Sequence, residues 1–351
     1  MQRRNFLKSI SLSALAIPTI SGKTISNLVP SPDKIIKPKR LKKGDTLGLI
    51  TPGSFINEDE LKESIDNLNT LGFNAVYTKN ILARYGYFGG TDEQRASDVN
   101  EMFKRDDVDG IVCTRGGWGC SRILPLLDFK MIKNNPKVLI GYSDVTALLY
   151  GIFKETGLVC FHGPVGISTF NDYSVDYFRW VLMEPQQTLT FYNPHYDKNK
   201  DREGYFPFTI RSGKSSGQLA GGNLSIVVSL IGTKYDIDCE NKIVFIEEIG
   251  EEPYRVDRML TQMIEAGKFK NVKGIMLGVF KNCKPKPEKS GISSSFSLDE
   301  VLFDRLAKLN VPTAYGMSFG HITNKFTLPF GIDAEFDSLA QTLTLLEPAV
   351  V

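Results

Sequence analysis

Ser143 stands where a serine hydroxyl could act as a nucleophile. Residues 137–141 (KVLIG) predict a strand and the pattern from Asp144 onward predicts a helix, so Ser143 falls on the turn between them. A hydroxyl on such a turn projects beyond the sheet edge, and the first helical amides, at the positive end of the helix dipole, point towards any oxyanion that forms. The alternative is that Ser143 or Asp144 only caps the helix, and spacing does not separate the two. Because GYSDV lacks the second glycine of GxSxG, an α/β-hydrolase elbow is not predicted.

Histidines are scarce, and this restricts the choice of a base. Only His162, His195 and His321 occur, and His321 is the best candidate because it lies in a glycine-flanked stretch, SFGHITNKFTLPFG. Glu247 ends the strand-like run IVFI and is followed by Glu248. A carboxylate at a strand end is well placed to orient an imidazole, although a surface or ion-paired glutamate is the commoner use. These residues could together form a nucleophile, a base and an acid.

Two adjacent glycines form a second feature that could contact a ligand. In RGGWG, between a strand-like and a helix-like run, Gly116 and Gly117 would let the backbone approach a substrate, and Arg115 could bind a carboxylate through two hydrogen bonds. A purely structural turn is the alternative. HExxH, paired CxxC motifs and glycine-rich phosphate loops are all absent from the sequence, so we expect neither a metal site nor a cofactor.

Elements of alternating type must position these residues. Within 45–169, strand-like runs at 46–51, 73–78, 110–114 and 137–141 alternate with helical patterns at 58–71, 92–104, 121–127 and 144–155. This order predicts a parallel sheet covered on both faces. A second α/β stretch, 213–351, holds strand-like runs at 242–248, 274–280, 312–317 and 343–346 and helical patterns at 223–232, 256–267 and 298–309.

Between the two stretches lies an aromatic-rich segment. Eleven of the 39 residues from 170 to 208 are aromatic, and they interrupt the α/β alternation. We interpret 170–212 as an inter-domain connection whose aromatic residues pack onto both domains or cover a cleft. A length of 351 residues agrees with about two domains, because one core rarely extends beyond roughly 250 to 300 residues.

Composition and charge narrow the class of partner. The formal net charge is +2, and without the first 22 residues 39 Lys and Arg face 40 Asp and Glu, so nucleic acid is not an expected partner. The basic run at 34–43 belongs to a segment, 23–44, that we interpret as a solvated linker. Five widely spaced cysteines favour small apolar residues in strands over a disulfide scaffold.

The N-terminus has the features of an export signal. Residues 1–22, MQRRNFLKSISLSALAIPTISG, place adjacent arginines before an uncharged run, and RRNFLK resembles a twin-arginine transport signal. The apolar part is about 12 residues, shorter than the ~20 that span a bilayer as a helix. We therefore expect a periplasmic protein with no stable membrane anchor once the signal is removed. An ordinary basic start before a buried helix is the alternative.

Several motifs, taken as a set, resemble the serine LD-carboxypeptidase family, the muramoyltetrapeptide carboxypeptidases. The matching strings span residues 45 to about 335 and are RGGWG with SRILPLLD, LIGYSD, FHGPV, GGNLS, IEEIGEEPYRVDRML and GHITNKFTLPFG. The resemblance implies a triad of Ser143, His321 and Glu247 that releases the terminal D-alanine from murein tetrapeptide or a related muropeptide without a metal. It also implies a flavodoxin-like or amidotransferase-like N-terminal domain, a smaller C-terminal α/β domain, and a homodimer.

The same resemblance frames the expected site and its alternatives. The amides of Asp144 and of Gly116 or Gly117 are the candidate oxyanion hole, and Arg115 is the candidate partner of the substrate carboxylate. Two residues depart from the family: Trp118 stands where Tyr is usual and Ile322 where Gly is common, which affects substrate preference more than reaction type. The alternatives are a peptidase of the microcin-immunity type, against which the export signal argues, and a non-catalytic periplasmic muropeptide-binding protein.

Overall fold

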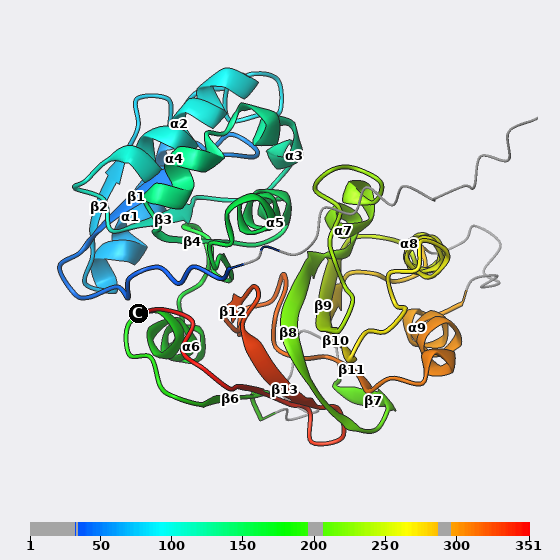
Figure 1. The fold of residues 1–351 in the computed structure, drawn as a ribbon. Coiled ribbons are helices and arrows are strands. Elements are labelled where there is room, and N and C mark those ends of the chain that lie inside the picture. The colour runs from blue at the N-terminus through cyan, green and yellow to red at the C-terminus, as the bar shows by residue number, and fades with distance from the viewer. Residues whose placement is uncertain (1–31, 33, 196–205, 287–295) are drawn as a thin grey trace, which may run out of the picture.

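The computed structural model describes residue 32 and residues 34–195, 206–286 and 296–351, which form two sheets with helices around them (Figure 1). The described part of the chain contributes six strands to the first sheet and eight to the second. The first sheet and its helices comprise β1 (Thr46–Ile50), α1 (Glu58–Thr70), β2 (Asn74–Tyr77), α2 (Asp92–Lys104), β3 (Gly110–Cys113), α3 (Cys120–Ile123), η1 (Leu124–Leu126), α4 (Phe129–Asn134), β4 (Val138–Gly141), α5 (Val145–Thr156), β5 (Phe161–His162) and β12 (Leu328–Pro329).

The first sheet confirms the predicted parallel α/β architecture. Its order is β12-β5-β4-β3-β1-β2, and all neighbours are parallel except β12. Every residue of β3 and β4 is buried, which explains why GIVC and VLIG are uninterrupted apolar runs instead of alternating ones. The predicted helix at 58–71 is α1, which begins with a capping box between Asn57 and Glu60.

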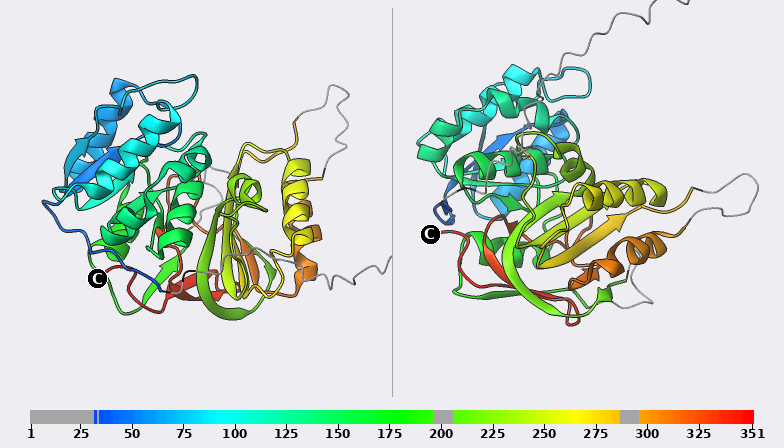
Figure 2. Two further views of the ribbon diagram at one scale, coloured as in Figure 1. Left: turned by 45° about the horizontal axis from the view of Figure 1, so that its top comes forward. Right: turned by 45° about the vertical axis from the view of Figure 1, so that its right-hand side comes forward.

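The second sheet is mixed. With its helices it comprises α6 (Asp172–Leu182), β6 (Leu189–Tyr192), β7 (Phe208–Arg211), β8 (Lys214–Asn223), α7 (Leu224–Leu230), β9 (Lys242–Ile249), α8 (Pro253–Glu265), β10 (Gly274–Lys281), α9 (Leu298–Leu306), η2 (Ala307–Leu309), β11 (Thr313–Tyr315), β13 (Asp333–Asp337) and β14 (Thr342–Leu345). Strands β8 to β11 are parallel, while β13, β14 and β6 add antiparallel at one edge and β7 at the other. Helices α7, α8 and α9 lie along one side of this sheet (Figure 2).

The two sheets are connected at several places. Helix α5 of the first sheet packs against α7 and β8 of the second. After β11 the chain returns to the first sheet, where β12 pairs with β5, and then re-enters the second sheet as β13. At this junction Lys154 of α5 donates a buried hydrogen bond of 2.7 Å to the carbonyl of Asp236. The loop that carries His321 therefore runs between the two sheets.

The aromatic-rich segment contains regular structure that its composition did not predict. It forms α6 and the edge strand β6, and the other edge strand, β7, begins at its end. Tyr177 stacks on Phe191 with ring centroids 4.8 Å apart, and both rings lie 5.0 Å from Phe326. Its buried aromatic residues therefore build core between α6 and the second sheet.

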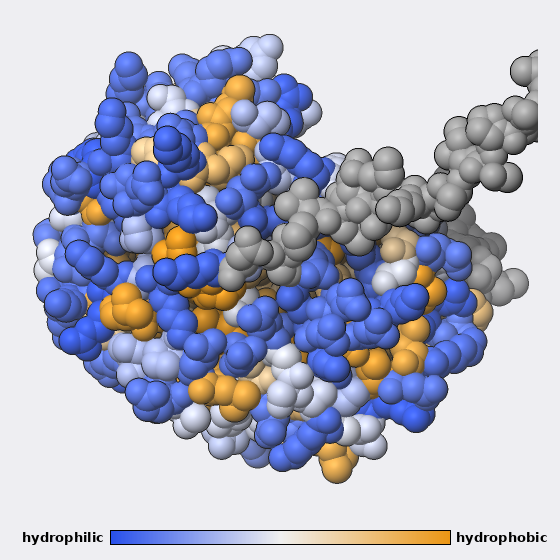
Figure 3. Space-filling model, viewed as in Figure 1, coloured by the Kyte–Doolittle hydropathy of each residue, from blue (hydrophilic) through white to orange (hydrophobic). Residues whose placement is uncertain are grey.

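The remaining features of the fold concern the surface and the termini. The predicted signal at 1–22 lies outside the described residues, as do residues 23–31 and 33 of the predicted linker. The described part of that linker is not simply solvated: Ile36 bridges Leu158, and Leu41 is buried, with its amide bonded to the carbonyl of Leu182 at 2.8 Å. No helix among the described residues has the length and apolarity needed to cross a bilayer. The face seen in Figure 3 is mostly hydrophilic, with hydrophobic residues in separate patches. All five cysteines are buried free thiols.

Candidate active site

Ser143 lies on a strained turn at the carboxyl end of β4. Its φ angle is +65°, a left-handed conformation that residues other than glycine rarely adopt. Helix α5 begins two residues later, and the Thr146 amide donates to the Ser143 carbonyl at 2.9 Å. The strand-to-helix turn predicted from sequence is confirmed, and such strain in a non-glycine residue is a feature of functional sites.

The RGGWG loop lies directly against this turn. A Cβ atom on Gly116 would fall 2.8 Å from Ser143 Cβ, and one on Gly117 would fall 2.1 Å from Ser54 Oγ, so only glycines allow this approach. The carbonyl of Gly116 accepts from the Ser54 amide at 3.0 Å. Among the hydrogen bonds between described residues, none uses the amide of Gly116, Gly117 or Asp144 as donor. These amides therefore have no other acceptor there, as the candidate oxyanion hole requires.

Asp144 positions the loop and does not cap its own helix. It is the N-cap residue of α5, but its side chain makes no capping hydrogen bond. Instead, its Oδ2 accepts from the Cys120 amide at 2.9 Å, where α3 begins after the RGGWG loop. The buried carboxylate of Asp144 thus joins the turn of Ser143 to the far end of that loop.

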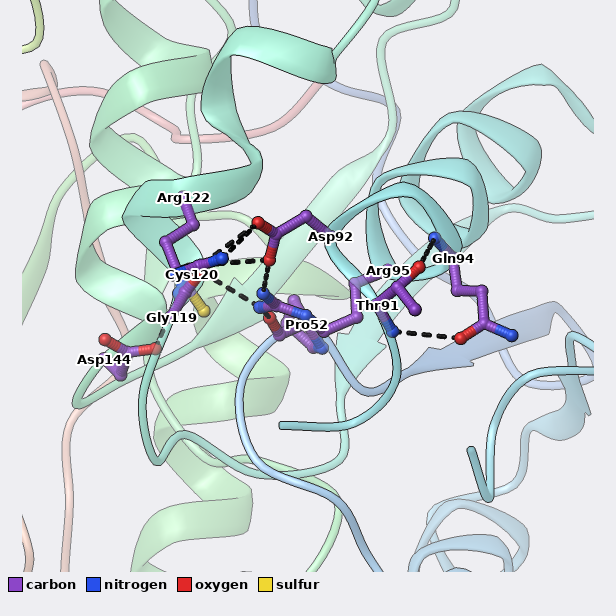
Figure 4. Close-up of polar contacts among 9 residues, drawn as sticks. All are labelled: Pro52, Thr91, Asp92, Gln94, Arg95, Gly119, Cys120, Arg122 and Asp144. Atoms are coloured by element: carbon purple, nitrogen blue, oxygen red, sulfur yellow. Dashed lines mark hydrogen bonds and ion pairs between the residues drawn. The ribbon is translucent and has the colours of Figure 1, made fainter. Parts of the chain in front are cut away.

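A buried arginine supports the loop from α2, as Figure 4 shows. Arg95 is almost fully buried, and it donates to the carbonyl of Gly119 at 2.9 Å and to the carbonyl of Pro52. Arg95 Nη2 forms an ion pair with Asp92 Oδ1 at 2.5 Å. The other oxygen of Asp92, Oδ2, forms an ion pair with Arg122 at 2.7 Å. Because these bonds connect the loops after β1 and β3, the backbone beside Ser143 is held from several directions.

Glu247 and His321 form the polar pair of the second sheet. His321 Nδ1 lies 2.7 Å from Glu247 Oε2, and the side chains are 15% and 0% exposed. Gly320 has a φ of +107°, and a Cβ there would lie 2.9 Å from Glu247 Oε2, so a glycine is required for the loop to reach the carboxylate. Burial by itself would raise the pKa of Glu247, but the neighbouring His321 lowers it below the ordinary value. Glu247 is therefore ionised beside the imidazole.

The adjacent carboxylate, Glu248, points elsewhere. Its Oε2 accepts from the amide and the hydroxyl of Ser225 at 2.8 and 2.6 Å, and its Oε1 accepts from Asn223 at 3.2 Å. Burial raises the pKa of Glu248, although Ser225 opposes the shift. Successive side chains of β9 thus face opposite directions, and only Glu247 contacts the imidazole.

Tyr142, next to Ser143, makes ring contacts with His321, Lys325 and His162. The rings of His321 and Tyr142 make a T-shaped contact with centroids 4.9 Å apart, and Lys325 Nζ lies over the Tyr142 ring, 4.9 Å from its centroid. His162 packs against Tyr142 at 6.0 Å and against Phe245 at 5.5 Å. Since Tyr142 precedes Ser143 in the chain, these contacts bring His321 beside the serine turn.

Burial changes the proton affinity of two of these groups. His162 is 1% exposed and neither ring nitrogen has a hydrogen-bond partner among the described residues. Its burial lowers its pKa to about 4, against the opposing charge of Glu247, so it is neutral near pH 7. Burial also raises the pKa of Tyr142 to about 12, with a further contribution from Glu247.

Arg115 forms an ion pair with Glu60 of α1. Its Nη1 lies 3.0 Å from Glu60 Oε1, and Glu60 also accepts from the Asn57 amide in the capping box of α1. About a third of the Arg115 side chain is exposed. Any carboxylate that binds Arg115 must therefore share it with Glu60.

Sequence reasoning missed several residues around the site. Tyr142, His162, Asn223 and Lys325 are in place around the triad candidates, yet none was assigned a role. Each lies inside a matching string (LIGYSD, FHGPV, GGNLS and GHITNKFTLPFG), which was the available signal. Of the two departures from the family, Trp118 is exposed and Ile322 is buried. No group of three or more His, Cys, Asp or Glu within the described ranges could hold a metal ion.

Known proteins are similar to this chain in sequence and in fold. The LD-carboxypeptidase N-terminal domain matches residues 47–163, and the C-terminal domain of the same family matches residues 216–336. A Bacillus subtilis protein named "Probable murein peptide carboxypeptidase" is 36% identical over 88% of this chain and 94% of its own. A muramoyltetrapeptide carboxypeptidase structure from Oxalobacter formigenes has a TM-score of 0.72 at 27% identity, covering 86% of this chain and 97% of its own. A structure of the microcin C7 self-immunity protein has a TM-score of 0.80 at 27% identity, covering 90% of this chain and 100% of its own. The Escherichia coli protein of that name is 28% identical over 87% of this chain and 94% of its own. The chain belongs to the LD-carboxypeptidase family and is a peptidase.

Proposed function

We propose that the protein is a serine LD-carboxypeptidase that releases the terminal D-alanine from murein tetrapeptide. The observation that carries this proposal is the 2.7 Å contact between Glu247 and His321, beside the strained turn of Ser143. The names of the Bacillus and Oxalobacter relatives supply the substrate class.

In the proposed acylation step, Ser143 Oγ attacks the carbonyl carbon before the terminal D-alanine. His321 accepts the hydroxyl proton, and Glu247 stabilises the resulting imidazolium and holds its tautomer. The amides of Asp144 and of Gly116 or Gly117 receive the oxyanion. When the C–N bond breaks, His321 returns the proton to the leaving amine, and D-alanine departs from an ester on Ser143.

Deacylation uses the same groups with water as the nucleophile. His321 takes a proton from water, the hydroxide attacks the ester carbon, and the proton returns to Ser143 Oγ as the C–O bond breaks. This step releases the tripeptide and regenerates the hydroxyl of Ser143. In this account Arg115 binds the terminal carboxylate of the substrate, with Glu60 competing for the same guanidinium.

The proposal extends to location and assembly. The twin-arginine pattern at Arg3 and Arg4 supports export to the periplasm, with no membrane anchor once residues 1–22 are removed. We further propose a homodimer, which light scattering of the purified protein would test. In the periplasm the substrate would be wall-derived peptide, a role in remodelling or recycling of peptidoglycan.

One assay tests the reaction and separates it from the two alternatives. Purified protein lacking the signal is incubated with murein tetrapeptide, and D-alanine and tripeptide are quantified by mass spectrometry. A tetrapeptide ending in L-alanine serves as the matched control and should remain intact. Tight binding without release of D-alanine would favour a binding protein. A parallel incubation contains an aminoacyl sulfamoyl nucleoside, the kind of compound named in structures of the microcin C7 self-immunity protein, and cleavage of that compound alone would favour the microcin-immunity type.

A further inference from the structure

Three exposed aromatic side chains lie on the turn at 85–88 and on the RGGWG loop, which itself lies against the serine turn. Tyr85, Tyr87 and Trp118 are 60%, 57% and 62% exposed, among the most exposed large side chains of the described residues. The rings of Tyr87 and Trp118 meet edge to face with centroids 5.9 Å apart. We call these three residues the aromatic platform. Exposed tyrosine and tryptophan in one cluster usually mark a binding surface, because apolar area left in water is costly.

The platform rests on a fixed base. Tyr85 and Phe88 exchange backbone hydrogen bonds of 3.1 and 3.0 Å, which closes a tight turn with Tyr87 near its tip. Phe88 is buried beneath Tyr87, at 4.3 Å between centroids, and the guanidinium groups of Arg95 and Arg122 lie 4.8 and 5.1 Å from its ring. The base therefore belongs to the same Arg95 network that holds the RGGWG loop. A preorganised ring surface loses little conformational entropy when a ligand binds.

The platform is within reach of a ligand attached to the reacting peptide. A Cβ atom on Gly116 would be in contact with Ser143, and Trp118 is two residues further, at most about 7.6 Å from Gly116 between Cα atoms. Three extended peptide residues span roughly 10 to 11 Å. A group attached at the amino end of the tripeptide portion of the substrate can thus reach the rings while its third carbonyl lies at Ser143.

We propose that the aromatic platform, Tyr85, Tyr87 and Trp118, binds the N-acetylated sugar ring that a muramoyl peptide carries at its amino end. A pyranose offers a face of C–H groups for stacking on an aromatic ring and hydroxyl and acetamido groups for water, which matches a surface of rings with polar edges. The inference rests on the proposed function, because it takes the stem peptide as the ligand at Ser143. It makes a sugar-bearing peptide, and not the free peptide, the preferred substrate.

The test measures binding of products, which are not turned over. The dissociation constants of muramoyl tripeptide and of free tripeptide are compared by calorimetry for the wild type, Tyr87→Ala and the conservative Tyr87→Phe. We expect the wild type to bind the sugar-bearing ligand about tenfold or more tightly, as one or two stacking contacts would give. Tyr87→Ala should lose most of that ratio, Tyr87→Phe should keep it, and Phe303→Ala, an exposed aromatic control on α9, should not change it.

Several outcomes would overturn the inference. Equal affinities of the wild type for both ligands, or a ratio that survives in both Tyr87→Ala and Trp118→Ala, would exclude a sugar subsite. If light scattering showed instead that Tyr87→Ala dissociates an oligomer while the ratio persists, the platform would be a contact between copies of this chain. Release of D-alanine is measured separately, so a protein that cleaves tetrapeptide without sugar preference refutes only this inference. A sugar preference without cleavage refutes only the proposed function.

Discussion

Glu247 meets His321 at 2.7 Å, whereas the next residue along the same strand faces the opposite way. The two carboxylates are both buried, but their pKa values shift in opposite directions: His321 lowers that of Glu247, and burial raises that of Glu248. Environment therefore separates two identical groups into an ionised partner of the imidazole and a hydrogen-bonded support for Ser225.

Replacing each glutamate by glutamine should separate their roles. Glu247→Gln keeps the size of the side chain but removes the charge that stabilises the imidazolium, so kcat should fall roughly 10²- to 10⁴-fold. Glu248→Gln keeps an acceptor for Ser225 and should change kcat far less. Steady-state release of D-alanine, with thermal melts to verify folding, makes the comparison. A larger loss in Glu248→Gln, with both variants folded, would contradict the assignment of the acid.

Removal of the Asp144 carboxylate should weaken the loop that carries the candidate oxyanion hole. Asp144→Ala leaves the buried Cys120 amide without its acceptor, so the free energy of unfolding should fall by about 1–3 kcal/mol and kcat should fall with it. Asp144→Asn keeps an amide oxygen at the same place and is the matched control. Urea unfolding and D-alanine release measure the two effects. Equal stability of the alanine and asparagine variants would show that this hydrogen bond does not support the loop.

His162 should make the folded protein sensitive to acid. Its pKa is about 4 in the folded protein and ordinarily 6.5, so well above pH 6.5 the imidazole is neutral in both folded and unfolded chains. As the pH falls from 6.5 towards 4, only the unfolded chain takes up this proton, and stability is lost. This contribution amounts to about 2–3 kcal/mol by pH 4.5.

His162→Phe should remove that part of the pH dependence while it preserves the packing against Tyr142 and Phe245. Urea unfolding at pH 7 and pH 4.5 gives the loss of unfolding free energy for the wild type and the variant. The variant should lose less on acidification. Identical losses would mean that His162 does not titrate between the folded and unfolded states in this range.

The proposed export signal gives a further prediction. Changing Arg3 and Arg4 together to lysine should trap the precursor in the cytoplasm, because a twin-arginine receptor reads the arginine pair, while the kinetics of the mature enzyme stay the same. Fractionation with an antibody against the C-terminal part of the chain would locate the protein. Normal export of the double variant would instead indicate the general secretory route.

The sequence predicted those parts of the fold in which local pattern and burial agree. The strands β3 and β4 are uninterrupted apolar runs because both faces of a parallel sheet are covered, and the helix after Ser143 follows from its spacing. Strand β8 was not predicted, since KSSGQLAGGN has the composition of a loop. Its pairing with β9 on one side and β13 on the other overrides that preference.

The candidate site was only partly predictable for a similar reason. The types and order of Ser143, Glu247 and His321 came from motifs, and the structure shows that Glu247 and His321 are in contact. The left-handed conformation of Ser143 could not be predicted, because glycine is the usual sequence signal of a positive φ and this position is a serine. The burial of Arg95 depends on acceptors from two distant loops. Such features arise from tertiary packing, which no local pattern contains.

The most direct measurement is the rate of D-alanine release from murein tetrapeptide by Ser143→Ala compared with the wild type. The side chain is small and only partly buried, so the variant should fold normally, and circular dichroism with thermal melts would verify this. If Ser143 forms the acyl-enzyme, kcat should fall by several orders of magnitude. A folded Ser143→Ala that kept more than about a tenth of the wild-type rate would contradict the nucleophilic role of Ser143.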